Sequence, residues 1–209
     1  IPYRGSWLEF EIDDKKKELI FAKIDRKKRI LGTLFLRAIG LDSREKIVAH
    51  FYKGKTVELS ADPNANNALV GSVAFTDVWV TLKDGQKVKR LRAGDELSPT
   101  YLTELVNDGI TSLQIIDEQA EDSLHSRIIL NCLEVEDAKY TQEGNDEPTK
   151  EDVLSPIYSV LQPGEMIAIE RAEKDLPDMF FSSRRYDLGS VGRYKFNKKF
   201  GSGDDEEDE

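Results

Sequence analysis

The sequence predicts an α+β protein: a helix-rich domain with a β-hairpin, interrupted by a small β-rich module with one helix. Two observations carry this prediction. The chain ends show a hairpin pattern and helical spacing of apolar residues, whereas the middle consists of short β-rich runs. An insertion explains this order, and it requires the module's ends to lie close together. We therefore expect a discontinuous domain (1–54 plus 137–200), an inserted module (55–136) and an end segment (201–209), which is either a disordered acidic tail or an artificial junction.

The N-terminal hairpin is predicted from alternation. Leu8, Phe10 and Ile12 share one face of a strand, a polar turn follows, and residues 19–24 form a second apolar run. A basic turn ends the hairpin at Arg29.

The next segment, 33–39, fits a strand or a helix equally well. A helix through Tyr52 then begins at a cap provided by Asp42 or Ser43, and we expect Gly54 to end it.

The module is predicted from three β-rich runs, at 56–59, 68–82 and 128–135, with a tight turn at Asp84-Gly85. One helix interrupts these runs. Ser98 is its expected N-cap, Pro99 occupies its first position, and Gly109 stops it.

Three further helices are expected after the linker that carries Gly144 and Pro148. A capping box over 149–152 starts the first, in which Pro156 predicts an irregularity or an early restart. The second covers 165–174. Asp187 caps the third, over 188–199, where Val191, Tyr194 and Lys198 share a face and Tyr194 is expected to pack.

Composition bounds the function. Six of the ten excess negative charges in this 209-residue chain lie in its last six residues, so the folded part is only mildly acidic. This charge argues against a dedicated DNA-binding domain with a basic footprint. A single cysteine precludes an intrachain disulfide and fits a reducing cytoplasm. No apolar run approaches the roughly 20 residues that cross a bilayer, and the chain opens without Met, which favours a segment of a longer polypeptide.

Catalytic groups are scarce. His50, His125 and Cys132 are interpreted as structural residues, and neither a Gly-rich phosphate loop nor a nucleophile elbow occurs. We therefore expect no catalytic residue, no metal ligand and no cofactor in this chain, and a stand-alone hydrolase is disfavoured.

Two segments are candidate nucleic-acid contacts. In the basic, aromatic run 184–199, five cations can meet phosphates, Arg193 can read a base edge, and the Asp187 carboxylate can accept from a base amine. The five phosphate-binding candidates are Arg184, Arg185, Lys195, Lys198 and Lys199. Near the N-terminus, Trp7 beside Arg4 suits stacking on an unpaired base. The alternatives are a solvated basic helix capped by Asp187 and a Trp7 that packs under a neighbouring loop.

These residues lie in sequence blocks that resemble the lobe (β2 region) of the bacterial RNA polymerase β subunit. The blocks occur at both ends of the chain, in the order that the family shows: 1–11, 24–29, 36–40, 157–158, 162–165, 180–182 and 185–197. Residues 89–97 and the following helix are similar to a lineage-specific insertion of the sandwich-barrel kind. The chain departs from the family pattern at Ser159, Gln162 and Met166.

The resemblance implies a role in transcription without catalysis. The lobe forms one wall of the main channel beside downstream DNA. Trp7 would stack on an unpaired non-template base, and the segment from Asp187 to Arg193 would help form a pocket for a neighbouring one. The implied partners are the β′, α and ω subunits, a σ factor, downstream DNA and regulators at the insertion. The catalytic magnesium would belong to β′. A protein-interaction module without nucleic-acid contact is the alternative function.

Overall fold

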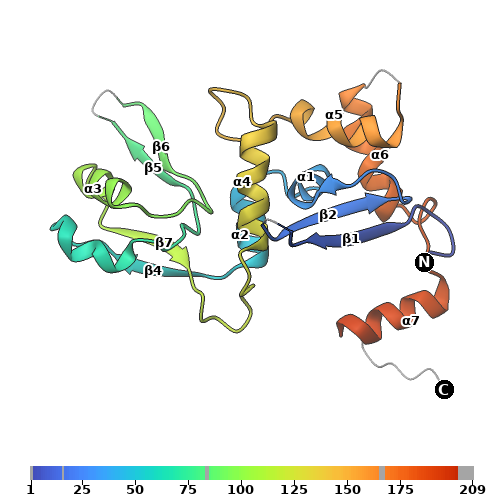
Figure 1. Ribbon diagram of the computed structural model, residues 1–209, viewed down its shortest axis with the longest axis horizontal. Helices are drawn as coiled ribbons and strands as arrows, with labels where there is room; N and C mark the ends of the chain where they lie inside the picture. The colour runs from blue at the N-terminus through green and yellow to red at the C-terminus, as the bar shows by residue number, and fades with distance from the viewer. Residues whose placement is uncertain (1, 16, 83–84, 165–167, 202–209) are drawn as a thin grey trace.

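Helices α2 (Arg44–Phe51) and α4 (Ile128–Tyr140) lie at the centre of the molecule, with a sheet-rich part on one side and most of the other helices on the other (Figure 1). The computed structural model describes residues 2–15, 17–82, 85–164 and 168–201. We call residues 54–117 the sheet module and the remaining described residues the helical body. Figure 1 shows the sheet module on the left, the other helices and the N-terminal sheet on the right, and α7 apart from both.

The N-terminal sheet has the order β1-β2-β3, with antiparallel pairing throughout. Strand β1 (Leu8–Asp13) pairs with β2 (Leu19–Ile24), and β3 is short (Ile30–Leu31), so the predicted hairpin is confirmed. Two side chains of the apolar face of β1 remain open to solvent: Phe10 is 54% exposed and Ile12 is 63% exposed. As an edge strand, β1 has one neighbour, so burial centres on β2.

Residues 33–39, which fitted a strand or a helix equally well, lie almost entirely in helix α1 (Gly32–Ala38). Helix α2 (Arg44–Phe51) has the predicted cap, because Ser43 Oγ accepts a hydrogen bond from the Lys46 N–H. The expectation that Gly54 stops this helix was wrong: the helix ends at Phe51, and Gly54 begins strand β4. A Cβ at Gly54 would lie 2.4 Å from Phe75 Cδ1, so this glycine permits a close approach.

Two antiparallel strand pairs build the sheet module. Strand β4 (Gly54–Glu58) pairs with β7 (Ser112–Ile116), and β5 (Val78–Thr81) pairs with β6 (Lys87–Leu91). Helix α3 (Pro99–Asn107) has Ser98 as its N-cap, as predicted. The expected run 68–82 is a strand only at its end, and a 3-10 helix, η1 (Pro63–Leu69), precedes it. The predicted turn residue Asp84 lies outside the described residues.

The predicted strand over 128–135 was wrong. These residues belong to helix α4 (Ile128–Tyr140). A short apolar run does not distinguish a buried strand from a buried helix. Here Leu130 and Leu133 face the sheet-module side and Cys132 faces the N-terminal sheet, so apolar residues are needed on more than one face.

The C-terminal helices are α5 (Lys150–Leu161), α6 (Ile169–Phe181) and α7 (Gly189–Phe200). The predicted capping box is present: Thr149 Oγ1 accepts from the Asp152 N–H and the Asp152 carboxylate accepts from the Thr149 N–H. Helix α5 continues through Pro156, so of the two outcomes expected there, an irregularity or an early restart, the restart does not occur. Residues 165–167, where α6 was expected to begin and where Met166 lies, are outside the described residues.

Three hydrophobic clusters organise the chain. The first joins β2, β3, α1, α5 and α6 around Leu34, Phe35 and Ile157. The third is the core of the sheet module, around Leu91 and Leu105. The second lies between them and joins α2 and α4 to the module's loops. In the described ranges, no helix combines the length and apolar character that crossing a membrane requires.

Candidate nucleic-acid interface

The two ends of the chain pair with each other. The N–H groups of Tyr3 and Arg4 donate to the Asp187 carbonyl oxygen, at 2.7 and 3.1 Å, and the Asp187 N–H donates to the Arg4 carbonyl oxygen at 2.7 Å. The Arg4 guanidinium also donates to the Ser183 carbonyl oxygen at 3.1 Å. The predicted contact residues Arg4 and Asp187, from opposite ends of the sequence, therefore lie side by side.

Gly5 makes this approach possible. Its φ is +120°, and a Cβ there would lie 2.8 Å from Tyr186 Cδ2 and 2.9 Å from the Arg185 carbonyl oxygen. Only glycine adopts this backbone without strain and leaves that space free.

Trp7 is held by a second turn. Its N–H donates to Asp25 Oδ1 at 2.7 Å, and the Asp25 N–H donates to the Trp7 carbonyl oxygen at 2.8 Å. The Arg26 guanidinium lies 4.6 Å from the centroid of the indole ring, within cation–π range. Trp7 is half-buried, with the Asp25–Arg26 turn beside it and the Arg26 guanidinium over one face of its ring.

Asp25 and Arg26 are functional candidates that sequence reasoning missed. Both have positive φ, 51° and 58°, and the Lys27 N–H closes the turn on the Ile24 carbonyl oxygen. Two successive left-handed residues are typical of a type I′ turn, which usually uses Asn or Gly. The basic composition of 26–29 was the available signal, but it suggests only a solvated hairpin end.

Asp187 also helps to start α7. Its Oδ1 accepts the Gly189 N–H at 2.9 Å. The N-cap position itself is occupied by Leu188, which makes no side-chain cap hydrogen bond, so the prediction of Asp187 as the N-cap was one residue off. The Asp187 side chain is half-buried. Within the described part of the chain, no hydrogen bond engages its second carboxylate oxygen.

The cations of the basic run are largely free. On α7, Arg193, Lys195, Lys198 and Lys199 are exposed, and none forms an ion pair with a described residue. Arg185 is the exception, with its Nη1 4.0 Å from Asp175 Oδ1. These four cations have no ion-pair partner among the described residues, so none of the ion pairs that the structure describes would have to break when they meet an anionic ligand.

The expected packing of Tyr194 was wrong, because Tyr194 is 66% exposed and α7 has no buried residue. Val191 and Lys198, which share its predicted face, are exposed as well. Figure 1 shows the cause: α7 stands away from the other helices, so no described element covers it.

The histidines and the cysteine have structural contacts. The His50 ring packs edge-on against Phe51 at 5.0 Å, and His125 Nδ1 is 3.1 Å from the Glu118 carbonyl oxygen. Cys132 is buried beside Ile20, and burial raises the pKa of its thiol to about 11. Within the described residues, no group of three or more His, Cys, Asp or Glu side chains could hold a metal ion.

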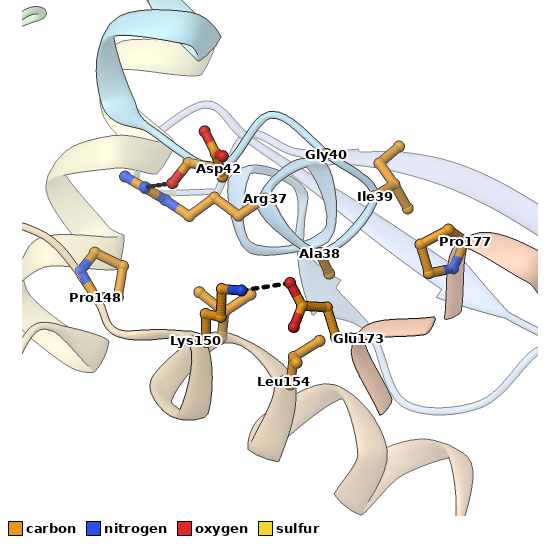
Figure 2. Close-up of a pocket in the computed structure, with 11 residues that line it drawn as sticks. Arg37, Ala38, Ile39, Gly40, Asp42, Pro148, Lys150, Leu154, Glu173 and Pro177 are labelled. Atoms are coloured by element: carbon orange, nitrogen blue, oxygen red, sulfur yellow. Dashed lines mark hydrogen bonds and ion pairs between the residues drawn. The ribbon is translucent and has the colours of Figure 1, made fainter. Parts of the chain in front are cut away.

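A pocket of about 300 Å³ lies between the end of α1 and the helices α5 and α6. Figure 2 shows Lys150 and Glu173 paired with each other beside it, at 2.5 Å, and Arg37 bonded to the Asp42 carbonyl oxygen. Each of its charged side chains has at least one protein partner, although Arg37 Nη2 is buried without a hydrogen-bond partner among the described residues. The candidate interface remains the region in which the segment leading to Trp7 pairs, through Arg4, with Asp187 at the start of α7.

Comparison with known proteins defines the class. The family model for RNA polymerase Rpb2, domain 2, matches residues 127–209. The DNA-directed RNA polymerase subunit beta of Treponema denticola is 54% identical over 207 residues, which cover 98% of this chain and 18% of the relative. The corresponding subunit of Treponema pallidum is 46% identical, over 97% of this chain and 17% of the relative. That of Borrelia turicatae is 47% identical, over 98% of this chain and 18% of the relative.

The chain therefore spans less than a fifth of the length of these relatives. It matches a segment of RNA polymerase subunits, within which the family model covers domain 2 of the Rpb2 type. The chain belongs to the family of the DNA-directed RNA polymerase β subunit.

Proposed function

We propose that this chain is the lobe region of a bacterial RNA polymerase β subunit and that it works in transcription as one wall of the downstream DNA channel. The observation that carries the proposal is the pairing of Arg4 with Asp187. Trp7 is three residues from Arg4, so at most about 11 Å of extended chain separates them. The pairing thus gathers an indole, a carboxylate and a basic helix in one region.

The proposed ligand is unpaired non-template DNA. Trp7 offers a stacking surface, and base–aromatic stacking contributes about 1–3 kcal/mol per base. Asp187 keeps one carboxylate oxygen for a base amine, and Arg193 is exposed and can donate to a base edge. Lys195, Lys198, Lys199 and Arg185 would meet phosphates, which makes that part of the binding salt-dependent.

The family suggests the rest of the assembly. We propose the β′, α and ω subunits and a σ factor as protein partners in the bacterial cytoplasm, with the catalytic magnesium held by β′. We also propose that residues 1–54 plus 137–200 form the lobe and that 55–136 are an insertion. The separate core of the sheet module supports this division, with α4 crossing its second boundary.

The test uses an assembled polymerase that contains this segment. A forked DNA carries 2-aminopurine at each unpaired non-template position in turn, and its fluorescence reports stacking. We expect Trp7→Ala to restore fluorescence at one position and Arg193→Ala to alter the signal at a neighbouring one. Trp79→Ala is the matched control, because Trp79 lies on strand β5 in the sheet module. Unchanged fluorescence in both Trp7→Ala and Arg193→Ala would contradict the proposal that these residues contact non-template bases. It would leave the family assignment unaffected.

A second proposed role is that the sheet module faces a regulator. Trp79 is 53% exposed, and the Lys89 ammonium lies 5.0 Å from its ring centroid. An exposed aromatic residue is a frequent anchor of protein interfaces. A photo-crosslinking residue at position 79 in the polymerase should capture a protein that the same residue at position 104, on α3, does not. Equal capture at both positions would argue against a specific surface.

A further inference from the structure

A buried arginine joins the sheet module to the helical body. Arg44 lies on α2 and its side chain is only 4% exposed. Its Nε donates to the Ala93 carbonyl oxygen and its Nη1 donates to Asp137 Oδ2 on α4, each at 2.5 Å. Its Nη2 donates to Asp95 Oδ1 at 3.2 Å. One guanidinium thus binds the module loop and helix α4 at the same time.

Arg92 makes the same connection from the other side. Its Nη2 lies 3.1 Å from Asp137 Oδ2, so this α4 carboxylate is shared by Arg44 and Arg92. Its Nε donates to Asp95 Oδ2 at 3.0 Å, and its Nη1 donates to the Asp146 carbonyl oxygen at 3.1 Å. The loop that carries Arg92 and Asp95 is therefore tied to α4 and to the segment before α5.

Glu147 adds a third connection. Its Oε2 accepts from Arg37 Nη1 on α1 at 2.6 Å and from the Arg44 N–H at 2.9 Å. Its Oε1 lies 4.0 Å from Lys89 Nζ on strand β6. We call Arg44, Arg92, Asp95, Asp137 and Glu147 the polar clasp.

Backbone packing brings the clasp together. Gly94 lies between Arg92 and Asp95 and has a φ of +84°. A Cβ there would lie 3.3 Å from Leu130 Cδ2 and 3.4 Å from Val48 Cγ2. The loop therefore rests directly on α2 and α4, where its carbonyl and carboxylate oxygens meet Arg44.

Two kinds of interaction join the sheet module to the helical body, namely apolar contacts and the polar clasp, and their effects differ. Apolar burial attracts without fixing a direction, whereas charge-assisted and forked arginine hydrogen bonds require a defined geometry. A buried ion network is a weak source of stability because desolvation offsets its attraction. Asp137 Oδ1 is buried and has no hydrogen-bond partner among the described residues, which adds to that cost. This network is therefore better suited to fixing the orientation of the sheet module relative to the helical body than to stabilising the fold.

We propose that the polar clasp fixes the orientation of the sheet module relative to the helical body, with Arg44 as the positioning residue. The apolar cluster between the units holds them in contact, and the clasp selects one arrangement. When a protein binds the sheet module and displaces it, helix α4 then moves with the module, because the clasp prevents bending between the two units. The inference does not depend on DNA contact, so the two proposals can fail separately.

Distances between spin labels test the proposal on the whole chain. Thr81→Cys on β5 and Ser159→Cys on α5 carry the labels, because both positions are exposed. Cys132, which is fully buried, is replaced by Ser in every variant. With the clasp intact, we expect one narrow distance distribution. Arg44→Met keeps much of the side-chain volume and removes the charge, and we expect a wider distribution with additional distances.

The matched control is Lys46→Met. Lys46 is on the same helix and pairs with Asp42, but the two side chains are 58% and 66% exposed, so the distribution should stay narrow. Asp137→Asn and Glu147→Gln weaken the clasp without removing Arg44, and each should widen the distribution. These two variants decide the matter if Arg44→Met does not fold. A folded Arg44→Met, or folded Asp137→Asn and Glu147→Gln, with the narrow distribution unchanged would overturn the proposal.

Discussion

The main chains of Arg4 and Asp187 form an isolated antiparallel β-bridge, although the two residues lie near opposite ends of the sequence. Three backbone hydrogen bonds of 2.7–3.1 Å hold this pairing. It closes the helical body and places the segment that leads to Trp7 against the start of α7. The candidate interface is therefore a product of chain closure, and its geometry depends on the backbone pairing of Arg4 with Asp187.

Gly5→Ala should weaken this closure. The new Cβ would meet Tyr186 and the Arg185 carbonyl oxygen at less than 3 Å, in a backbone conformation with φ +120°. We expect a loss of roughly 1–3 kcal/mol in the free energy of unfolding, measured with urea. Gly40→Ala is the control for backbone strain alone, since Gly40 has φ +128° and no atom within 4 Å of a Cβ. Equal losses in the two variants would show that the contact with Tyr186 is unimportant.

Arg26→Ala should uncover Trp7, because the guanidinium covers one face of the indole ring at 4.6 Å. The chain has two tryptophans, and Trp79→Phe leaves Trp7 as the remaining one. In this background, acrylamide should quench the Trp7 fluorescence more strongly in Arg26→Ala than with Arg26 present. Lys28→Ala changes the same turn at an exposed position and should leave quenching as it is. An unaltered quenching constant in Arg26→Ala would contradict the stacked arrangement.

Glu136 gives a pH dependence of defined sign. Burial raises the pKa of its carboxyl above the ordinary value of 4.5, although Arg37, bonded at 2.7 Å, acts in the opposite direction. Between 4.5 and the raised pKa, the folded state holds a proton that the unfolded state has lost. The raised pKa of Glu136 therefore adds to the free energy of unfolding at pH values below the pKa in the unfolded state. This added stability is lost as pH rises through the pKa in the folded state.

The measurement for Glu136 is a series of urea titrations across that pH range. The free energy of unfolding of the wild type should fall relative to that of Glu136→Gln as pH rises, because Gln does not titrate. Glu134→Gln, on the same helix but with its side chain 72% exposed, provides the comparison. A difference between wild type and Glu136→Gln that stays constant with pH would count against the shift.

Thr149→Ala removes the N-cap of α5. Thr149 Oγ1 accepts the Asp152 N–H at 3.2 Å, and its hydroxyl also contacts the Asp152 carboxylate at 2.7 Å. Loss of an N-cap of this kind costs about 0.5–2 kcal/mol, so thermal unfolding should occur at a lower temperature. Thr149→Ser keeps the hydroxyl and should retain most of the stability. A Thr149→Ser variant as unstable as Thr149→Ala would point to the lost methyl group instead of the cap.

Helix α7 should exchange its amide hydrogens faster than α4. No residue of α7 is buried, whereas α4 buries six residues. Local opening costs little where few apolar contacts are lost. Hydrogen-exchange mass spectrometry of the whole chain can compare peptides from 189–200 and 128–140 directly. Equal protection of the two helices would show that α7 is stabilised by contacts that the structure does not contain.

The sequence by itself determined the features that depend on neighbouring residues. The caps at Ser43, Ser98 and Thr149 were predicted correctly, because each cap joins a side chain to a backbone N–H three residues away. The β1–β2 hairpin was predicted from alternation for the same reason. The residues of the candidate interface were also named from sequence, since their chemistry is visible in their types and in the resemblance they carry.

The tertiary structure decided what depends on distant residues. Residues 128–135 became a helix because α4 lies between two cores and needs apolar side chains on several faces. Tyr194 is exposed because no described element covers α7. Arg26 reached Trp7 through a left-handed turn that its residue types do not indicate. The buried contacts of Arg44 likewise join residues far apart in sequence, and local patterns carry no information about which distant oxygens a guanidinium will meet.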